Sequence, residues 1–116
     1  MKGTWQFAVL LVSIPAAALE APGNQPTAER AWSELMKSMD QMHTRMATVE
    51  RSGDSDIDFA RLMLPHHQAA IGMARTELVY GKDPQMRRLA QEIVTDQQSE
   101  IELMQLWLRR RAASPR

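Results

Sequence analysis

Apolar residues recur every three or four positions along most of this chain, a pattern that predicts amphipathic helices. The first stretch begins at Thr27, a good N-cap residue, and runs to about Glu50. Its apolar positions are Trp32, Leu35, Met36, Met39, Met42, Met46 and Val49. No window alternates between apolar and polar residues as a strand does, so the chain is predicted to be all-α.

A turn over residues 52–56, with Gly53 as its breaker, separates this stretch from a second helix between about Ile57 and Tyr80. The candidates for its N-cap are Asp54, Ser55 and Asp56. The inner face of the second helix is expected to carry Phe59, Leu62, Met63, His66, Ala70, Met73 and Ala74.

Gly81 is expected to end the second helix, and Asp83-Pro84 is expected to begin a third, as an N-cap followed by proline at the first helical position. Its inner stripe would be Met86, Leu89, Ala90, Ile93, Gln97, Ile101, Met104 and Leu108. The sequence therefore predicts an up-down three-helix domain over residues 27–111, followed by a tail over residues 112–116.

Pro65 lies well inside the second helix, where it lacks a backbone donor and crowds the carbonyl of Arg61. A kink or break is expected there. It would either wrap the helix around its core or aim His66 and His67, which follow directly, and the proline alone does not decide between these alternatives.

Residues 1–18 have the order of a secretory signal peptide: Lys2, an apolar run over residues 5–14, and small residues for cleavage after Ala18, or alternatively Ala21. The alternative is an uncleaved N-terminal anchor, but the apolar run is shorter than the roughly 20 residues of a membrane span. Residues 19–26 form a polar leader. We expect a bacterial periplasmic or secreted protein without stable membrane insertion after cleavage.

The charge is balanced, with 14 basic and 14 acidic residues, so nothing favours nucleic acid or an anionic membrane as a partner. The chain contains no cysteine. Helix packing, oligomerisation or a bound metal must therefore stabilise it without disulfides, and methionine is the only sulfur ligand. Three helices of this length leave part of the apolar stripe uncovered, which favours a homo-oligomer that completes a larger bundle.

Methionine is unusually frequent, with eight residues besides the initiator. A single Met is ordinarily flexible core filler, and a Met-rich surface that binds protein is a second alternative. However, the spacing gathers Met39, Met42, His43 and Met46 on one patch of the first helix, beside Met36. Thioether sulfur suits Cu(I), and imidazole accepts copper as well.

A second cluster combines Met63, His66, His67 and Met73 on the second helix. Met63 precedes the two histidines by three and four positions, which places these side chains close together. The third helix would contribute Met104 as a ligand, with Gln97 and Glu100 hydrogen-bonded to the histidines in support.

The segments MLPHHQAAIGMA (residues 63–74) and LAQEIVTDQQSEIELMQLWL (residues 89–108) resemble the domain-of-unknown-function 305 (CopM-like) family, and the similarity runs from about Asp56 to Leu108. The resemblance implies a secreted or periplasmic domain of ferritin-like, helix-bundle architecture. Some members bind copper and silver through Met and His and support copper resistance, whereas many have no assigned role. Carried onto this chain, the family pattern indicates Met63, His66, His67, Met73 and Met104, with Gln97 and Glu100 in support.

The leading hypothesis is a binder of Cu(I) or Ag(I) that buffers or carries the metal. The alternative is a helical interaction module whose Met-rich face packs a homodimer or another exported protein. Catalysis is not predicted, because a di-iron bundle needs paired Glu-x-x-His motifs and the closest match is a single Asp40-x-x-His43. No Ser/His/Asp arrangement, Gly-rich phosphate loop or thiol nucleophile is present either.

Overall fold

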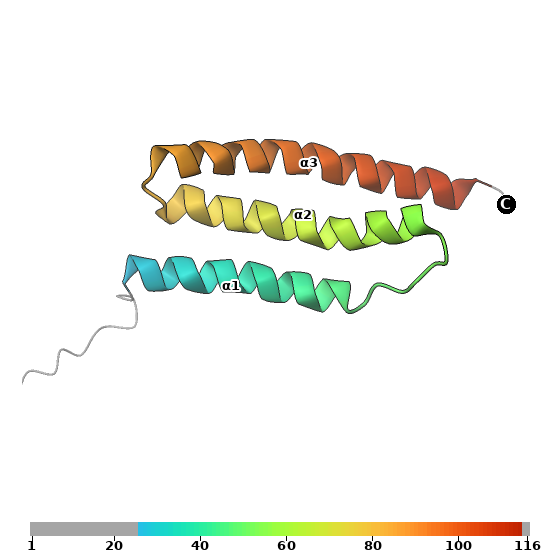
Figure 1. Cartoon of the computed structure of the whole chain (residues 1–116), viewed down its shortest axis with the longest axis horizontal. Helices are drawn as coiled ribbons and strands as arrows, with labels where there is room; N and C mark the ends of the chain where they lie inside the picture. Colours follow the sequence, from blue (N-terminus) through green and yellow to red (C-terminus); the bar gives the residue numbers. More distant parts are fainter. Residues whose placement is uncertain (1–25, 115–116) are drawn as a thin grey trace, which may run out of the picture.

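The computed structural model describes residues 26–114, which form three helices in up-down order: α1 (Thr27–Met46), α2 (Ser55–Tyr80) and α3 (Pro84–Ala113) (Figure 1). No strand occurs among these residues, so the predicted all-α class and helix order are confirmed. The predicted signal peptide (residues 1–18) lies outside the described residues, as do nearly all of the leader and the last two residues of the tail.

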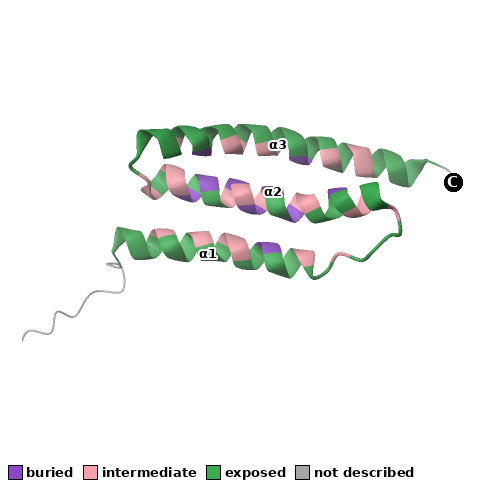
Figure 2. Cartoon of the chain, viewed as in Figure 1, coloured by how far each residue is buried: buried purple, intermediate pink, exposed green. Residues whose placement is uncertain are grey.

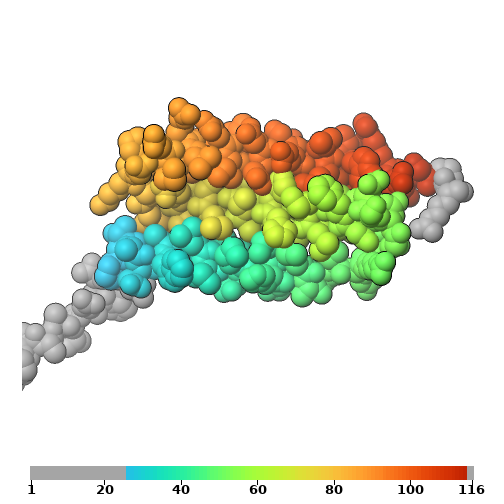
Figure 3. Space-filling model, viewed as in Figure 1, coloured from blue at the N-terminus to red at the C-terminus, as the bar shows by residue number. Residues whose placement is uncertain are grey.

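The three helices lie side by side in one layer, with α2 in the middle (Figure 1). α1 packs against α2 and α3 packs against α2, but α1 and α3 do not contact each other. The space-filling view shows α2 between its two neighbours, with no other part of the chain over it on that face (Figure 3). Because the layer is open, the ferritin-like bundle type stays a prediction.

Local signals placed the starts of α2 and α3 correctly. The carboxylate of Asp54 accepts hydrogen bonds from the backbone N–H groups of Asp56 (2.9 Å) and Ile57 (3.2 Å), as an N-cap does. Asp83 caps α3 in the same way and is followed by Pro84 at the first helical turn. α3 then continues to Ala113, two residues beyond the predicted end of the domain.

The predicted bounds of α1 were less accurate. Thr27 is the first helical residue and not the cap, because Pro26 precedes the helix and no side chain caps it. α1 also ends at Met46 and not near Glu50. His43 and Arg45 lie in its last turn, where cationic or hydrogen-bonding side chains complement the negative end of the helix dipole.

α2 passes through Pro65 without a break, so the predicted interruption is wrong in its stronger form. A proline inside a helix costs about 3 kcal/mol. Here Pro65 is itself buried, and α2 is held by a packed helix on either side. Tertiary packing therefore outweighs the lost backbone hydrogen bond.

Most of the buried residues belong to α2 (Figure 2). They form two groups on opposite sides of this helix, since successive residues are about 100° apart. The His67 side faces α3, because His67 contacts Glu100, and the opposite side faces α1, because Gly72 lies against Ser38. Ala60, Ala74 and His67 lie on the first side, and Pro65, Ala69 and Thr76 lie on the second.

This arrangement overturns several predicted inner positions. Trp32 and Phe59 are each 63 % exposed, and Met36, Leu62, Met73, Met86 and Leu89 are also exposed. These residues do form apolar stripes along their helices, as predicted, but the stripes are exposed and were expected to be buried. A helix in the middle of a layer buries two edges, so its broad apolar surface between those edges remains open.

Gly72 allows the close approach of α1 and α2. A Cβ atom at this position would lie 2.6 Å from the hydroxyl oxygen of Ser38. Such a distance is shorter than normal van der Waals contact, so a larger residue would push α1 away from α2.

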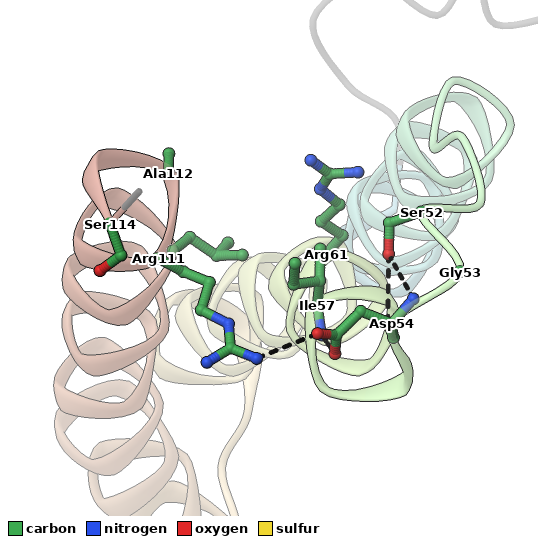
Figure 4. Close-up of a pocket in the computed structure, with 9 residues that line it drawn as sticks. Ser52, Gly53, Asp54, Ile57, Arg61, Arg111, Ala112 and Ser114 are labelled. Atoms are coloured by element: carbon green, nitrogen blue, oxygen red, sulfur yellow. Dashed lines mark hydrogen bonds and ion pairs between the residues drawn. The ribbon is translucent and has the colours of Figure 1, made fainter. Parts of the chain in front are cut away.

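Polar contacts join the α1–α2 loop to the C-terminal turns of α3 (Figure 4). Arg111 donates a hydrogen bond to Asp54 at 3.1 Å, and its guanidinium also lies 5.6 Å from the centre of the Trp107 ring. In the first turn of α2, Asp58 accepts hydrogen bonds from the backbone N–H and the hydroxyl of Ser52 in the loop, both at 2.7 Å. The Arg111 hydrogen bond lowers the pKa of the Asp54 carboxyl, and the Ser52 hydrogen bonds lower the pKa of Asp58.

We predict that Asp54→Asn makes the stability of the fold less dependent on acid pH. Asn still caps α2 but loses the charged contact with Arg111. The pKa of Asp54 in the folded state is below its ordinary value of 3.8, so its contribution is present above that value and disappears as the pH falls through the folded pKa. The melting temperature of the variant should therefore be lower than that of the wild type near neutral pH, and the difference should shrink below about pH 4.

Thermal melts followed by circular dichroism across this pH range would measure the effect. Asp56→Asn is the matched control, since it removes a carboxylate from the same helical turn that has no hydrogen bond or ion pair with the described residues. A pH-independent difference between wild type and Asp54→Asn would contradict the assigned role of the ion pair.

Candidate metal-binding face

The open surface of α2 between its two buried sides carries both Met and His. Positions about 100° apart along the helix place His66 on this surface and the adjacent His67 on the α3 side. The residues of α2 that share the surface with His66 are Phe59, Leu62, Met63, Ala70, Met73 and Glu77. The opposite surface of α2 carries Arg61, Gln68, Arg75 and Val79.

Helical spacing likewise shows on which side of the layer each residue of α1 lies. Arg45 donates a hydrogen bond to Gln68, so Arg45 lies on the Gln68 side of the layer. The α1 residues that point to the other side, together with His66, are Trp32, Met36, Met39, His43 and Met46.

α3 is placed by a shallow hollow that Phe59 shares with Leu103, Met104 and Trp107. These α3 residues therefore lie on the same side of the layer as Phe59 and His66. Helical spacing adds Met86, Leu89, Ile93, Asp96 and Glu100 to this side.

We call this side the Met/His face. Its Met and His residues are Met36, Met39, His43, Met46, Met63, His66, Met73, Met86 and Met104. Its apolar neighbours include Trp32, Phe59, Leu62, Leu89, Leu103 and Trp107. The other side of the layer is called the arginine face, since it carries Arg45, Arg61, Arg75, Arg87 and Arg109.

The predicted ligands from α1 and α2 lie at matching levels on this face. Ser38 against Gly72, and Arg45 with Gln68, fix the register of the two helices. In that register Met39 lies level with Met73, and Met46 lies level with His66. The two Met/His clusters predicted from sequence therefore share one surface, and each spans α1 and α2.

α3 adds Met104 to the same region. His67 contacts Glu100, which fixes the register of the antiparallel pair α2 and α3. Met63 is one helical turn from His67, and Met104 is one turn from Glu100 in the same direction along the layer. Met63 and Met104 therefore lie across the α2–α3 boundary from each other.

Two of the predicted ligands lie elsewhere. Met42 is the buried methionine of α1, with only 8 % exposure, and it packs between α1 and α2. His67 is also buried, on the side of α2 that faces α3. Neighbouring residues on a helix point in directions about 100° apart, so the two adjacent histidines cannot occupy the same surface.

Both ring nitrogens of His67 have partners. Nδ1 lies 3.0 Å from the carbonyl oxygen of Met63, a geometry that needs a proton on Nδ1. Nε2 contacts a carboxylate oxygen of Glu100, so one proton must lie between these two groups. A metal ion could reach Nε2 only by displacing that proton. His67 therefore serves first as a tie between α2 and α3.

His43 and His66 differ from His67 in both respects. Each is exposed, and no hydrogen bond or ion pair with residues 26–114 holds its ring. Their imidazole nitrogens are therefore available to an ion on the Met/His face.

Gln97 has a different position from the one expected. Glu100 contacts His67, but no hydrogen bond joins Gln97 to either histidine of α2. Its Oε1 atom is buried without a hydrogen-bond partner among the described residues. An unpartnered buried carbonyl typically costs about 1–3 kcal/mol, so this oxygen is a feature that a bound group could satisfy.

Sequence reasoning did not assign Met36 or Met86 as ligands, although the three- and four-residue spacing already placed them on the stripes. Among residues 26–114, no three His, Asp or Glu side chains come together in a way that could hold an ion.

A family model described as domain of unknown function (DUF305) matches residues 11–108. The chain therefore belongs to this family, and the resemblance inferred from its motifs is confirmed. A search of curated proteins finds no match. None of the three described helices has the length and apolarity that a membrane span requires.

We predict that His67→Ala lowers the free energy of unfolding of the metal-free protein by about 1–3 kcal/mol, because it removes a buried ring with two hydrogen bonds. His66→Ala is the matched control and should change it by no more than about 0.5 kcal/mol, since that ring is exposed. Urea unfolding in the presence of a chelator would measure both. Equal losses would show that the two histidines do not have the different roles assigned to them.

Proposed function

We propose that this protein binds a soft monovalent metal ion, Cu(I) or Ag(I), through Met and His side chains of the Met/His face. It would act without catalysis, as a periplasmic or secreted protein that buffers copper or contributes to copper tolerance. The observation that carries this proposal is the distribution of methionine. Of the eight residues besides the initiator, only Met42 is buried, and the other seven lie on the face that carries His43 and His66.

This distribution disfavours the interpretation of methionine as core filler. A filler side chain gains stability by being buried in an irregular gap. Met36, Met73 and Met86 remain 36–49 % exposed, so between a third and a half of that gain is absent within one chain. Their flexible thioethers are instead free to turn toward an ion.

The donor atoms on the face fit a soft ion better than a hard one. Met63, Met104 and His66 offer thioether sulfur and neutral imidazole nitrogen, which Cu(I) accepts. Thioethers need no deprotonation before they bind, so the methionine part of the site should tolerate mildly acid conditions. The carboxylate of Glu100, one helical turn from Met104, is already engaged with His67.

The second candidate is a helical interaction module with no metal role. Trp32, Phe59 and Leu103 favour it, because large apolar side chains that are 63–65 % exposed mark surfaces that bind other proteins. Both candidates use the same face, so they must be separated by measuring metal affinity.

We predict that Met63→Leu combined with Met104→Leu lowers the Cu(I) affinity at least tenfold, or about 1.4 kcal/mol. Leucine keeps nearly the same volume and apolarity but removes the sulfur, so packing should change little. Competition with a chromogenic Cu(I) chelator would give the affinity of protein purified after expression of the full chain, and circular dichroism would verify its helicity.

Met86→Leu is the matched control, because Met86 lies on the same face in the first turn of α3, far from His66. Its affinity should equal that of the wild type. An unchanged affinity in the double variant would remove Met63 and Met104 from the site. If the wild type neither competes for Cu(I) nor gains thermal stability with Ag(I), the metal function is wrong and the interaction module is favoured.

A further inference from the structure

The three described helices lack the second packed layer that a stable helical domain normally contains. Domains are built from at least two packed layers around one core, whereas α1, α2 and α3 form a single layer. No large side chain in it is less than 2 % exposed. The buried apolar residues are mainly alanines, which contribute little hydrophobic stabilisation.

Most of the exposed large apolar side chains lie on one side of the helical layer. Ten large apolar side chains are exposed, and only Val79 and Leu106 lie off the Met/His face. The other eight are Trp32, Met36, Phe59, Leu62, Met73, Met86, Leu89 and Leu103.

The area of this surface matches that of a dimer interface. At about half exposure and the typical size of large apolar side chains, these eight residues present on the order of 700 Å². A stable interface buries about 800 Å² on each partner.

The charge distribution disfavours the arginine face as an interface between two copies. The arginine face carries Arg45, Arg61 and Arg75 along its length, so two copies stacked through it would repel each other. α1 and α2 contribute no Lys or Arg to the Met/His face, and helical spacing places three carboxylates on it, those of Glu77, Asp96 and Glu100.

We propose that a second copy of this chain covers the Met/His face, so that two three-helix layers form a symmetric six-helix bundle. The same patch serves both copies, as in other two-fold interfaces. A copy supplies a layer of matching length, width and apolarity, which a short peptide does not. Dimerisation does not depend on the proposed metal function. If both hold, the Met and His side chains of the two copies face each other, and each copy can supply ligands to an ion between the layers.

The test is sedimentation velocity of the metal-free protein over a wide range of concentration, after expression of the full chain and removal of metal with a chelator. We expect a dimer. Leu103→Glu should weaken it at least tenfold in dissociation constant, because the interface would bury an unpaired carboxylate. Leu103 is 65 % exposed in the single chain, so this variant should still fold, and circular dichroism would verify that.

Val79→Glu is the matched control, since Val79 is 70 % exposed but lies on the arginine face. It should leave the dimer intact, whereas Phe59→Glu, on a different helix from Leu103, should weaken it. A monomeric wild type would overturn the proposal and favour cover by residues 1–25 or by another protein. Unchanged dimers in both interface variants, or equal weakening by Val79→Glu, would overturn it as well.

These measurements contain no metal, so they are independent of the Cu(I) competition. A dimer that ignores Cu(I) would contradict only the proposed function. A monomer that binds Cu(I) would contradict only the dimer.

Discussion

The packing of α1 and α3 on opposite sides of α2 determines most of the other features of this protein. A helix with neighbours on two sides can bury only two narrow strips, and in α2 these strips consist largely of small residues such as Ala60, Ala69 and Ala74. Small residues allow the helices to approach closely, as at Gly72 and Ser38. The larger apolar residues of α2 are then left on a surface that neither neighbour covers.

This constraint explains how adjacent histidines acquire different environments. His67 lies on a buried strip, where the Met63 carbonyl and Glu100 hold its ring. His66, about 100° around the helix, lies on the open surface among methionines. His67 fixes the orientation of α3 against α2, and in this orientation Met104 and Met63 lie across the α2–α3 boundary from each other. His67, a structural side chain, thus positions the thioethers of Met63 and Met104, which could bind an ion together with His66.

The sequence predicted the features that depend on local chemistry. Asp54 and Asp83 cap their helices because a carboxylate close in sequence can reach the first free N–H groups, whatever the rest of the fold does. The apolar stripes were also identified correctly. Their burial was not, because periodicity shows which side of a helix is apolar but not which element covers it. Phe59 and Trp32 were assigned to a core that a single layer does not contain.

Contacts between distant residues were the least predictable. Glu100 was expected to hydrogen-bond to the two histidines of α2, but the sequence did not decide which one it contacts. Gln97, which was expected to share that role, has no partner for its buried oxygen among residues 26–114. The choice depends on the exact rotation of α3, which helical spacing alone leaves uncertain by a large part of a turn. Arg111 and Asp54 lie even further apart in sequence, and no motif connects them.

The open Met/His face links the proposed metal binding with the proposed dimer, although each of the two proposals can hold without the other. A thioether on an open surface is exposed to water, which competes weakly for Cu(I) but leaves the methionine side chains conformationally free. Covering the surface removes water and restricts these side chains, which lowers the entropy that an ion must otherwise overcome to gather its ligands. An interface rich in methionine can also adjust to the presence or absence of an ion, because its side chains are flexible and polarizable. The abundance of methionine where leucine would pack more rigidly is therefore what the two proposals together require, since they assign one surface to both an interface and a ligand shell.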